Sequence, residues 1–188
     1  MLSQRAIDGD LPCLNTATCR PCTVMSHRKQ IDLPPHIQPY WVGYLSESGQ
    51  DPDTPVYDVF HFDDNKSGAN ELAQLVLRGR KLATASLLWE YETGGKRPPQ
   101  AGDLSVVTDW DGIPLCIIET SEVEVRAFED VDEEFAAAEG EGDLSLEYWK
   151  DAHWAYFERV CTGLGRERSP EMSVVCERFR VVFPSSTS

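Results

Sequence analysis

Three apolar runs separated only by turns constrain the fold of this chain most strongly. They lie at Leu104–Thr108, Pro114–Thr120 and Ser121–Phe128. The polar segment Asp109–Gly112 between the first two ends in an Asp-Gly step, which is typical of a β-hairpin. Strands joined by such short connections run antiparallel, because a parallel pair needs a long crossover. The centre of the chain is therefore predicted to form antiparallel strands.

Helices are predicted on both sides of this region. Apolar residues three and four positions apart indicate an amphipathic helix over Ala69–Arg78, which ends at Gly79. A second helix is predicted over Ser145–Gly163 and a shorter one around Pro39–Glu47. One face of the second helix groups side chains that we interpret as core: Leu146, Trp149, His153, Tyr156 and Val160.

Further strands complete the predicted sheet. Tyr57–Phe62 alternates, Met172–Phe183 closes the apolar pattern, and the small residues of Lys81–Trp89 indicate a strand or a turn. Hairpins and helical crossovers are mixed along the chain, which argues against a doubly wound α/β sheet. We expect an α+β fold, a small and mainly antiparallel β-barrel or strongly curved sheet with flanking helices.

Composition narrows the function classes. The formal net charge is −15, from 32 acidic and 17 basic residues, so a wholly basic nucleic-acid coat is excluded. Any contact with phosphate needs a local basic patch. Hydrophobic residues make up 41%, which rules out bulk disorder. No apolar run approaches the roughly 20 residues that span a bilayer, so no membrane partner is expected.

The two ends of the chain differ from its centre. We predict a flexible extension over residues 1–30, one domain over residues 31–183 and a frayed tail over residues 184–188. The extension contains one Cys-x2-Cys pair without nearby histidines, a weak zinc signal. The three later cysteines are interpreted as buried thiols. With no apolar leader in the sequence, they favour a cytoplasmic location.

Acidic and basic residues occupy separate segments. Glu129–Glu147 holds nine acids and no lysine or arginine. The bases form two groups, which we interpret individually as surface charges: Arg78, Arg80, Lys81, Lys96 and Arg97, then Arg159, Arg166, Arg168, Arg178 and Arg180. Gly79-Arg80-Lys81 is an exception, because it precedes the small residues Ala83–Ser86, which a ligand can approach closely.

Several segments of residues 56–183 form an ordered set: Glu71-Leu72, Val76–Ser86, Gly102-Asp103, Cys116–Thr120, Phe135–Trp149 and Val174–Phe179. The second segment contains a Gly-x-Lys motif at Gly79-Arg80-Lys81, directly after a helix. Together these segments resemble the ASCH domain, a relative of the PUA-like RNA-binding barrels. The resemblance implies a β-barrel with flanking helices and a cleft for RNA or a nucleobase.

Two activities are associated with the family that this chain resembles. One is a metal-assisted ribonuclease that acts on single-stranded RNA. The other, in a smaller relative, is hydrolysis of the acetyl amide of N4-acetylcytidine by a lysine, a threonine and a glutamate. The resemblance assigns the lysine to Lys81 and the threonine to Thr84. It assigns the glutamate to Glu141, with Glu139 as the alternative.

These residue types suit either chemistry. Beside apolar walls, desolvation would lower the pKa of Lys81 and let it activate the Thr84 hydroxyl, with Glu141 orienting the lysine. In RNA cleavage, a charged Lys81 would instead stabilise the negative charge at phosphorus. The ligands of a Mn²⁺ or Mg²⁺ ion would be Glu139, Glu141 and Asp143, unless these acids form only a solvated loop. Since a cleft lysine makes few core contacts, we expect Lys81→Ala to lose activity with little loss of fold.

Residues around Lys81 are predicted to bind RNA or a modified cytidine nucleoside. The predicted binding set is Gly79, Arg80, Ser86, Trp89, Tyr91, Glu119 and Arg178. Trp89 and Tyr91 would stack on a base, or else pack the rim of the barrel. Glu119 would act in the site, or else pair with an arginine.

The function predicted first is hydrolysis of single-stranded RNA in a cleft around Lys81. The alternatives are an N4-acetylcytidine amidohydrolase, a non-catalytic RNA-binding regulatory module, and a binder of small nucleosides. The salt dependence of binding separates the RNA hydrolase from the nucleoside binder, because binding through phosphates weakens steeply as the salt concentration rises.

Overall fold

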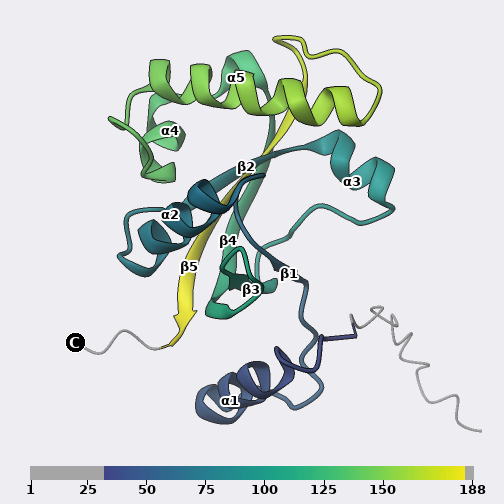
Figure 1. Cartoon of the computed structure of the whole chain (residues 1–188), viewed down its shortest axis with the longest axis vertical. Helices are drawn as coiled ribbons and strands as arrows, with labels where there is room; N and C mark the ends of the chain where they lie inside the picture. The colour runs from purple at the N-terminus through teal and green to yellow at the C-terminus, as the bar shows by residue number, and fades with distance from the viewer. Residues whose placement is uncertain (1–31, 185–188) are drawn as a thin grey trace, which may run out of the picture.

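The computed structural model describes residues 32–184, which contain one five-stranded sheet and five α-helices (Figure 1). The strands are β1 (Asp58–Phe60), β2 (Ala83–Leu87), β3 (Leu104–Thr108), β4 (Pro114–Ala127) and β5 (Ser173–Phe183). The helices are α1 (Gln38–Ser48), α2 (Lys66–Leu77), α3 (Leu88–Gly94), α4 (Glu133–Glu139) and α5 (Leu146–Gly163), with one 3-10 turn at Phe128–Asp130. The predicted flexible extension and all but the first residue of the predicted tail lie outside the described residues.

The sheet is mixed and curls into a half-barrel, so the predicted β-barrel is only partly correct: the sheet is strongly curved and mainly antiparallel, as expected, but it does not close. Its strand order is β1-β3-β4-β5-β2, with β1 parallel to β3 and the other pairs antiparallel. β1 is parallel because the chain passes through α2, β2 and α3 before it returns as β3. A three-residue edge strand is too short to supply the staggered pairing with β2 that closure needs.

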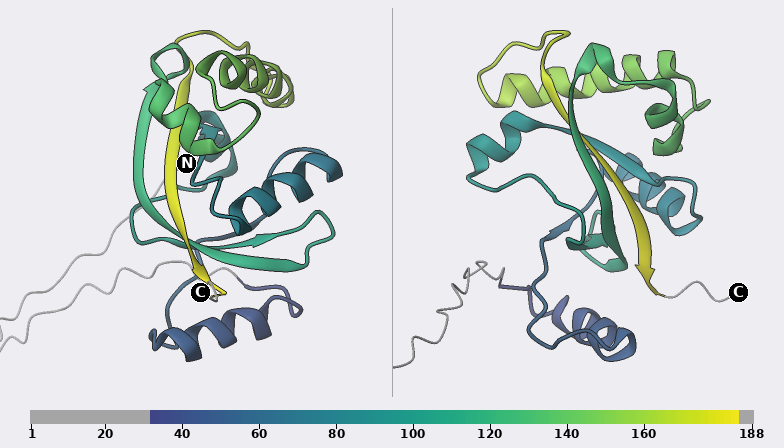
Figure 2. Two further views of the ribbon diagram at one scale, coloured as in Figure 1. Left: turned by 90° about the vertical axis from the view of Figure 1, so that its left-hand side faces the viewer. Right: turned by 180° about the vertical axis from the view of Figure 1, so that it is seen from behind.

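The predicted strands Pro114–Thr120 and Ser121–Phe128 form one continuous strand, β4, of 14 residues. Its first part pairs with β3, and β5 pairs along nearly its whole length. The register of β4 against β5 shifts between Thr120 and Glu122, and such irregularities bend a strand. Figure 2 shows β4 and β5 curving together from one end of the molecule to the other.

The predicted helices are present, with small changes at their ends. α2 begins where the Asn65 side chain accepts a hydrogen bond from the Gly68 amide at 2.9 Å. It ends as predicted at Gly79, which has a φ of +66°. α3 was not predicted: the chain leaves β2 through a cap in which Glu90 accepts from the Leu87 amide at 2.9 Å.

Three apolar clusters hold the sheet to its helices. α4 and α5 cover one end, where Phe128, Phe157 and Trp149 are buried, and α1 covers the other (Figure 1). Cys116, Cys161 and Cys176 are buried free thiols, as predicted. Within residues 32–184, no helix has the length and apolar character needed to cross a membrane.

Candidate active site

A cavity of about 590 Å³ opens between the concave side of the sheet and the helices, and we call it the Lys81 cavity. Aromatic and aliphatic side chains form much of its wall: Tyr57, Phe60, His61, Phe62, Leu72, Tyr91, Tyr148 and Tyr156. Its charged members are Asp58, Asp63, Lys81, Glu90, Lys96, Glu139, Glu141, Arg159 and Glu177. This volume falls within the range of about 300–1,000 Å³ that is common for small-ligand sites.

Lys81 is buried in this cavity by the way α2 ends. The amides of Arg80 and Lys81 both donate to the Leu75 carbonyl, at 2.9 and 3.2 Å, which turns the chain inward after Gly79. The Lys81 side chain is only 1% exposed. Its ammonium donates to Glu139 Oε2 at 2.6 Å and to Glu141 Oε1 at 2.5 Å. A buried cation thus lies between two carboxylates.

Glu139 comes from the last turn of α4 and is also 1% exposed. Its Oε1 accepts from the Trp149 indole N–H at 2.9 Å and lies 3.4 Å from His153 Nε2. Both carboxyl oxygens of Glu139 are therefore already engaged by the protein.

The end of α4 packs tightly on the segment that carries Lys81. A Cβ on Gly140 would lie 2.1 Å from the Arg80 carbonyl oxygen.

The charges in this cluster support one another. Burial alone would lower the pKa of Lys81, but the charges and hydrogen bonds of Glu139 and Glu141 outweigh it, so that this pKa is raised. The expected fall in the pKa of Lys81 is therefore wrong. Burial acts to raise the pKa of Glu139, yet Lys81 and His153 hold it at about 2. Lys81 is thus an ammonium donor at neutral pH, rather than a base.

The other predicted catalytic residues lie near this cluster. Thr84 on β2 lines the Lys81 cavity, directly opposite Glu177 in the β2–β5 pairing. Glu141 is 20% exposed and is the outer member of the ion cluster. Lys81, Thr84 and Glu141 therefore share one cavity, as their predicted roles require.

The three predicted metal ligands are not gathered as a metal site. Asp143 lies at the surface, where its carboxylate accepts from the Ser145 amide at 2.9 Å. Across residues 32–184, no three histidine, cysteine, aspartate or glutamate side chains form a group that could hold a metal ion. With Glu139 held by Lys81 and Trp149, this arrangement does not fit Mn²⁺ or Mg²⁺, and we derive no step through a metal.

Two predicted base-binding residues lie in the Lys81 cavity and one does not. Ser86 Oγ and the Tyr91 hydroxyl are 2.8 Å apart, and both line the cavity. Burial raises the pKa of Tyr91 to about 12, so its hydroxyl keeps its proton. Trp89 instead packs against the core, with the Arg166 guanidinium 4.7 Å from its ring, and does not line the cavity.

The remaining members of the predicted binding set lie outside the cavity wall. Gly79 and Arg80 shape the turn that buries Lys81 but do not line the cavity. Glu119 pairs with Arg180 at 2.7 Å, which is the alternative that the sequence left open. Arg178 pairs with Glu134 at 3.1 Å, beside a separate small hollow.

Several residues of the cavity escaped the sequence analysis. His153 and Tyr156 were interpreted as core, but both are partly exposed and line the Lys81 cavity, whereas Trp149 is core as expected. Glu177 was not singled out either. The available signal was a lone acid within the apolar run of β5, at a position that faces the concave side of the sheet.

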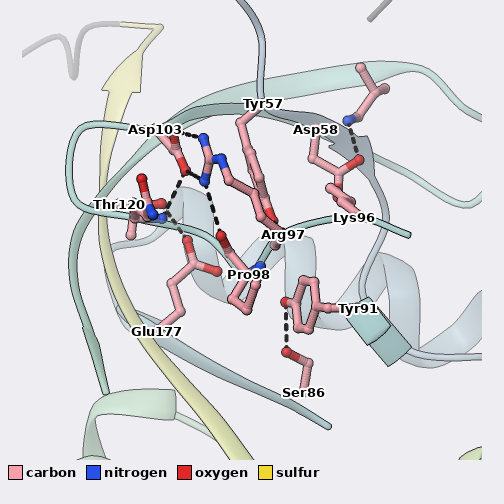
Figure 3. A network of polar contacts seen from close by, with 12 residues as sticks. Tyr57, Asp58, Ser86, Tyr91, Lys96, Arg97, Pro98, Asp103, Thr120 and Glu177 are labelled. Atoms are coloured by element: carbon pink, nitrogen blue, oxygen red, sulfur yellow. Dashed lines mark hydrogen bonds and ion pairs between the residues drawn. The ribbon is translucent and has the colours of Figure 1, made fainter. Parts of the chain in front are cut away.

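A polar network supports the far wall of the cavity (Figure 3). The Tyr57 ring lies near two cations, with Lys96 Nζ at 4.3 Å and the Arg97 guanidinium at 4.7 Å from its centroid. Arg97 forms a two-pronged ion pair with the buried Asp103, at 2.6 and 2.7 Å, and Lys96 pairs with Asp58. Tyr57 is thereby fixed as one wall of the cavity.

Comparisons with known proteins agree with this fold. A family model described as the ASCH domain matches residues 58–183, which confirms the resemblance seen in the sequence. A crystal structure of an ASCH domain from Lactobacillus crispatus JV V101 has 39% identity and a TM-score of 0.73, covering 80% of this chain and 96% of that one.

A crystal structure of a protein from Enterococcus faecalis V583 has 34% identity and a TM-score of 0.71, with 78% of this chain and 88% of that one covered. No functionally curated protein matches the chain.

Proposed function

This chain belongs to the ASCH domain family, whose PUA-like fold is usually linked to RNA binding, and we propose that it binds single-stranded RNA by receiving one unstacked nucleoside in the Lys81 cavity. The observation that carries this is a cavity of nucleoside scale with aromatic walls and a buried, hydrogen-bonding ion cluster. Proteins that recognise single-stranded RNA typically stack a splayed base on aromatic rings and bond to its edges.

The aromatic walls suit a planar ring. Tyr57, Phe62 and Tyr156 contribute faces or edges to the Lys81 cavity, and the Ser86–Tyr91 pair adds hydroxyl groups. Base–aromatic stacking is worth about 1–3 kcal/mol per base. A single captured nucleoside therefore contributes substantially to affinity even in a protein of net charge −15.

The charges of the cavity favour the base over the phosphate. Six acidic residues and three basic residues line it, so a phosphodiester placed deep inside would meet net repulsion. The side chains of Lys96 and Arg159 are 32% and 54% exposed and form ion pairs with Asp58 and Asp64. They are the cations of the cavity lining that an RNA backbone at its mouth would meet, in exchange for these pairs. The backbone is thus expected to cross the mouth while one base enters.

Binding of a fluorescein-labelled single-stranded RNA to the full chain, followed by anisotropy, tests this function. Ser86→Trp should fill part of the cavity and weaken binding at least tenfold. Val125→Trp on β4 is a matched control, because Val125 is 52% exposed and does not line the cavity. Equal affinities of the two variants and the wild type would overturn the proposal.

Hydrolysis is a second candidate, favoured by the presence of Thr84 in the same cavity as Lys81 and Glu141. For N4-acetylcytidine, the Thr84 hydroxyl would attack the acetyl carbonyl carbon while Glu141 takes its proton. The Lys81 ammonium would stabilise the oxyanion. The proton would then pass to the departing N4 amine, and water would release acetate from Thr84. For RNA, the same ammonium would stabilise charge at phosphorus.

A paired assay tests hydrolysis, with labelled single-stranded RNA in one arm and N4-acetylcytidine in the other. Thr84→Val and Glu141→Gln run beside the wild type to exclude contaminating hydrolases. Cytidine release that both variants reduce at least 100-fold supports the amidohydrolase. RNA cleavage that depends on Glu141 supports the ribonuclease. No turnover in either arm leaves RNA binding as the function and removes hydrolysis.

A further inference from the structure

Glu177 is a buried acid that the ion cluster around Lys81 does not use. It lies on β5 and is 9% exposed, yet it lines the Lys81 cavity. Its Oε1 accepts from the Thr120 hydroxyl at 2.6 Å, as Figure 3 shows. Its Oε2 has no hydrogen-bond partner among residues 32–184, and within that range no lysine, arginine or histidine forms an ion pair with the carboxyl group. A carboxyl oxygen is thus left for a ligand.

The position of Glu177 directs it at whatever occupies the cavity. Residues directly opposite in an antiparallel pair project to the same face, and Glu177 is opposite Thr84. Ser86 lies two residues further along β2, on that same face, and also lines the cavity. Glu177, Thr84 and Ser86 therefore form a polar strip along one wall, bounded by Tyr91.

The surroundings of Glu177 favour its neutral form. Burial raises the pKa of Glu177 to about 7, against the lowering effect of the Thr120 hydrogen bond. The charges of Asp103 and Asp58 add to this rise, and that of Lys96 opposes it. Because Oε1 already accepts a hydrogen bond, the proton belongs on Oε2, which then faces the cavity as a donor.

We propose that Glu177 is a specificity-determining residue that binds the amidine edge of a base, a ring-nitrogen acceptor beside an exocyclic amino donor, as in cytosine and adenine. This inference rests on the proposed binding of a nucleoside in the Lys81 cavity. The protonated Oε2 donates to the ring nitrogen, while the second lone pair of Oε1 accepts from the amino group.

The chemistry favours an amidine edge over the imide-like edges of uracil and guanine. A cytosine or adenine ring nitrogen is basic and can share the Glu177 proton, which gives the base partial positive charge. The cavity is lined by six acids and three bases, and this field stabilises a positive base. Uracil and guanine present a ring N–H beside a carbonyl oxygen, and the neutral acid can pair with that edge as well. Because this carbonyl is far less basic than an amidine nitrogen, it takes no share of the proton and gains nothing from the acidic field of the cavity.

Calorimetric titration of the full chain with the four nucleosides at pH 6.0 and pH 8.0 tests this inference. With a pKa of about 7, roughly nine-tenths of Glu177 is protonated at pH 6 and roughly one-tenth at pH 8. Cytidine and adenosine should therefore bind about tenfold more tightly at pH 6. At pH 6, uridine and guanosine should bind more weakly than cytidine and adenosine. Neither should gain tenfold affinity between pH 8 and pH 6, because the ionised carboxylate still accepts from a ring N–H.

Two variants separate recognition from a structural role. Glu177→Gln carries a permanent N–H donor and carbonyl acceptor but no transferable proton, so it should keep binding cytidine and adenosine and lose the pH dependence. Glu177→Leu should lose the preference. His61 and His153 also line the cavity, and a pH dependence that persists in Glu177→Gln would assign the effect to them and overturn the inference.

Failure of the inference differs from failure of the proposed function. If all four nucleosides bind equally at both pH values, the cavity still binds nucleosides but Glu177 does not select among them. If no nucleoside and no RNA binds at either pH, the proposed function fails and the inference with it.

Discussion

Replacing Lys81 by methionine removes the central charge of a buried cluster while keeping most of its volume. Glu139, 1% exposed, would then be left without its nearest cation, and Glu141 would lose a partner but keep contact with solvent. The sequence predicts that replacing Lys81 abolishes activity with little loss of fold. The structure instead predicts that this change lowers the free energy of unfolding.

The size of the effect follows from Glu139. The pKa of Glu139 falls from its ordinary value of 4.5 to about 2, with Lys81 the largest favourable influence. At about 1.4 kcal/mol per pH unit, this corresponds to about 3 kcal/mol of stabilisation at neutral pH. Removing one partner of a buried ion pair typically costs about 3–5 kcal/mol. We therefore expect Lys81→Met to lose about 3–5 kcal/mol of unfolding free energy at pH 7.

Urea unfolding at pH 7, followed by tryptophan fluorescence, measures this loss. The control is the double variant Lys81→Met/Glu139→Gln, in which the carboxamide oxygen still accepts from the Trp149 indole. This double variant should recover at least half of the lost stability, because no buried charge is left unpaired. A cost below about 1 kcal/mol for Lys81→Met, or no recovery in the double variant, would refute the reasoning.

Three further outcomes are expected. Because the pKa of Glu139 is lowered on folding, its stabilisation is complete above about pH 4.5 and is lost as pH falls towards 2. Acid titration of unfolding free energy should show a fall of about 3 kcal/mol that Glu139→Gln reduces. Gly140→Ala should destabilise more than Gly79→Ala in thermal unfolding. Both glycines have positive φ, but only at Gly140 would a Cβ clash, 2.1 Å from a carbonyl oxygen. RNA affinity measured between 50 and 300 mM NaCl should have a log–log slope of about −1.4, as about two phosphate contacts through Lys96 and Arg159 imply; a slope steeper than about −4 would contradict base-centred binding.

The elements that could be predicted from sequence are those with local causes. The helix after Asn65 follows from its cap and its apolar spacing, and the hairpin between β3 and β4 follows from Asp109–Gly112. α3 escaped because Leu88–Gly94 is too short for periodicity. The half-barrel escaped because parallel pairing of β1 with β3 depends on contacts between segments far apart in the chain.

The same distinction holds for the candidate site. Lys81, Thr84 and Glu141 could be placed together because the family motifs fix their order. The ionisation state of Lys81 could not be predicted from the sequence, because its pKa depends on Glu139, 58 residues away in sequence. Trp89 and Tyr91 show the limit most clearly, since two aromatics of one short helix point into different surroundings.

The central claim is that the Lys81 cavity receives a base of RNA. Its most direct test is a titration of the full chain with a short single-stranded RNA, followed residue by residue through the backbone amide chemical shifts in two-dimensional NMR. We predict that the largest shifts fall on residues around the Lys81 cavity, including Thr84, Ser86 and Glu177. Val125 on β4, which is exposed and does not line the cavity, should shift little. Shifts confined to the outer face of the sheet, or no shifts at all, would contradict the claim that this cavity receives a base of RNA.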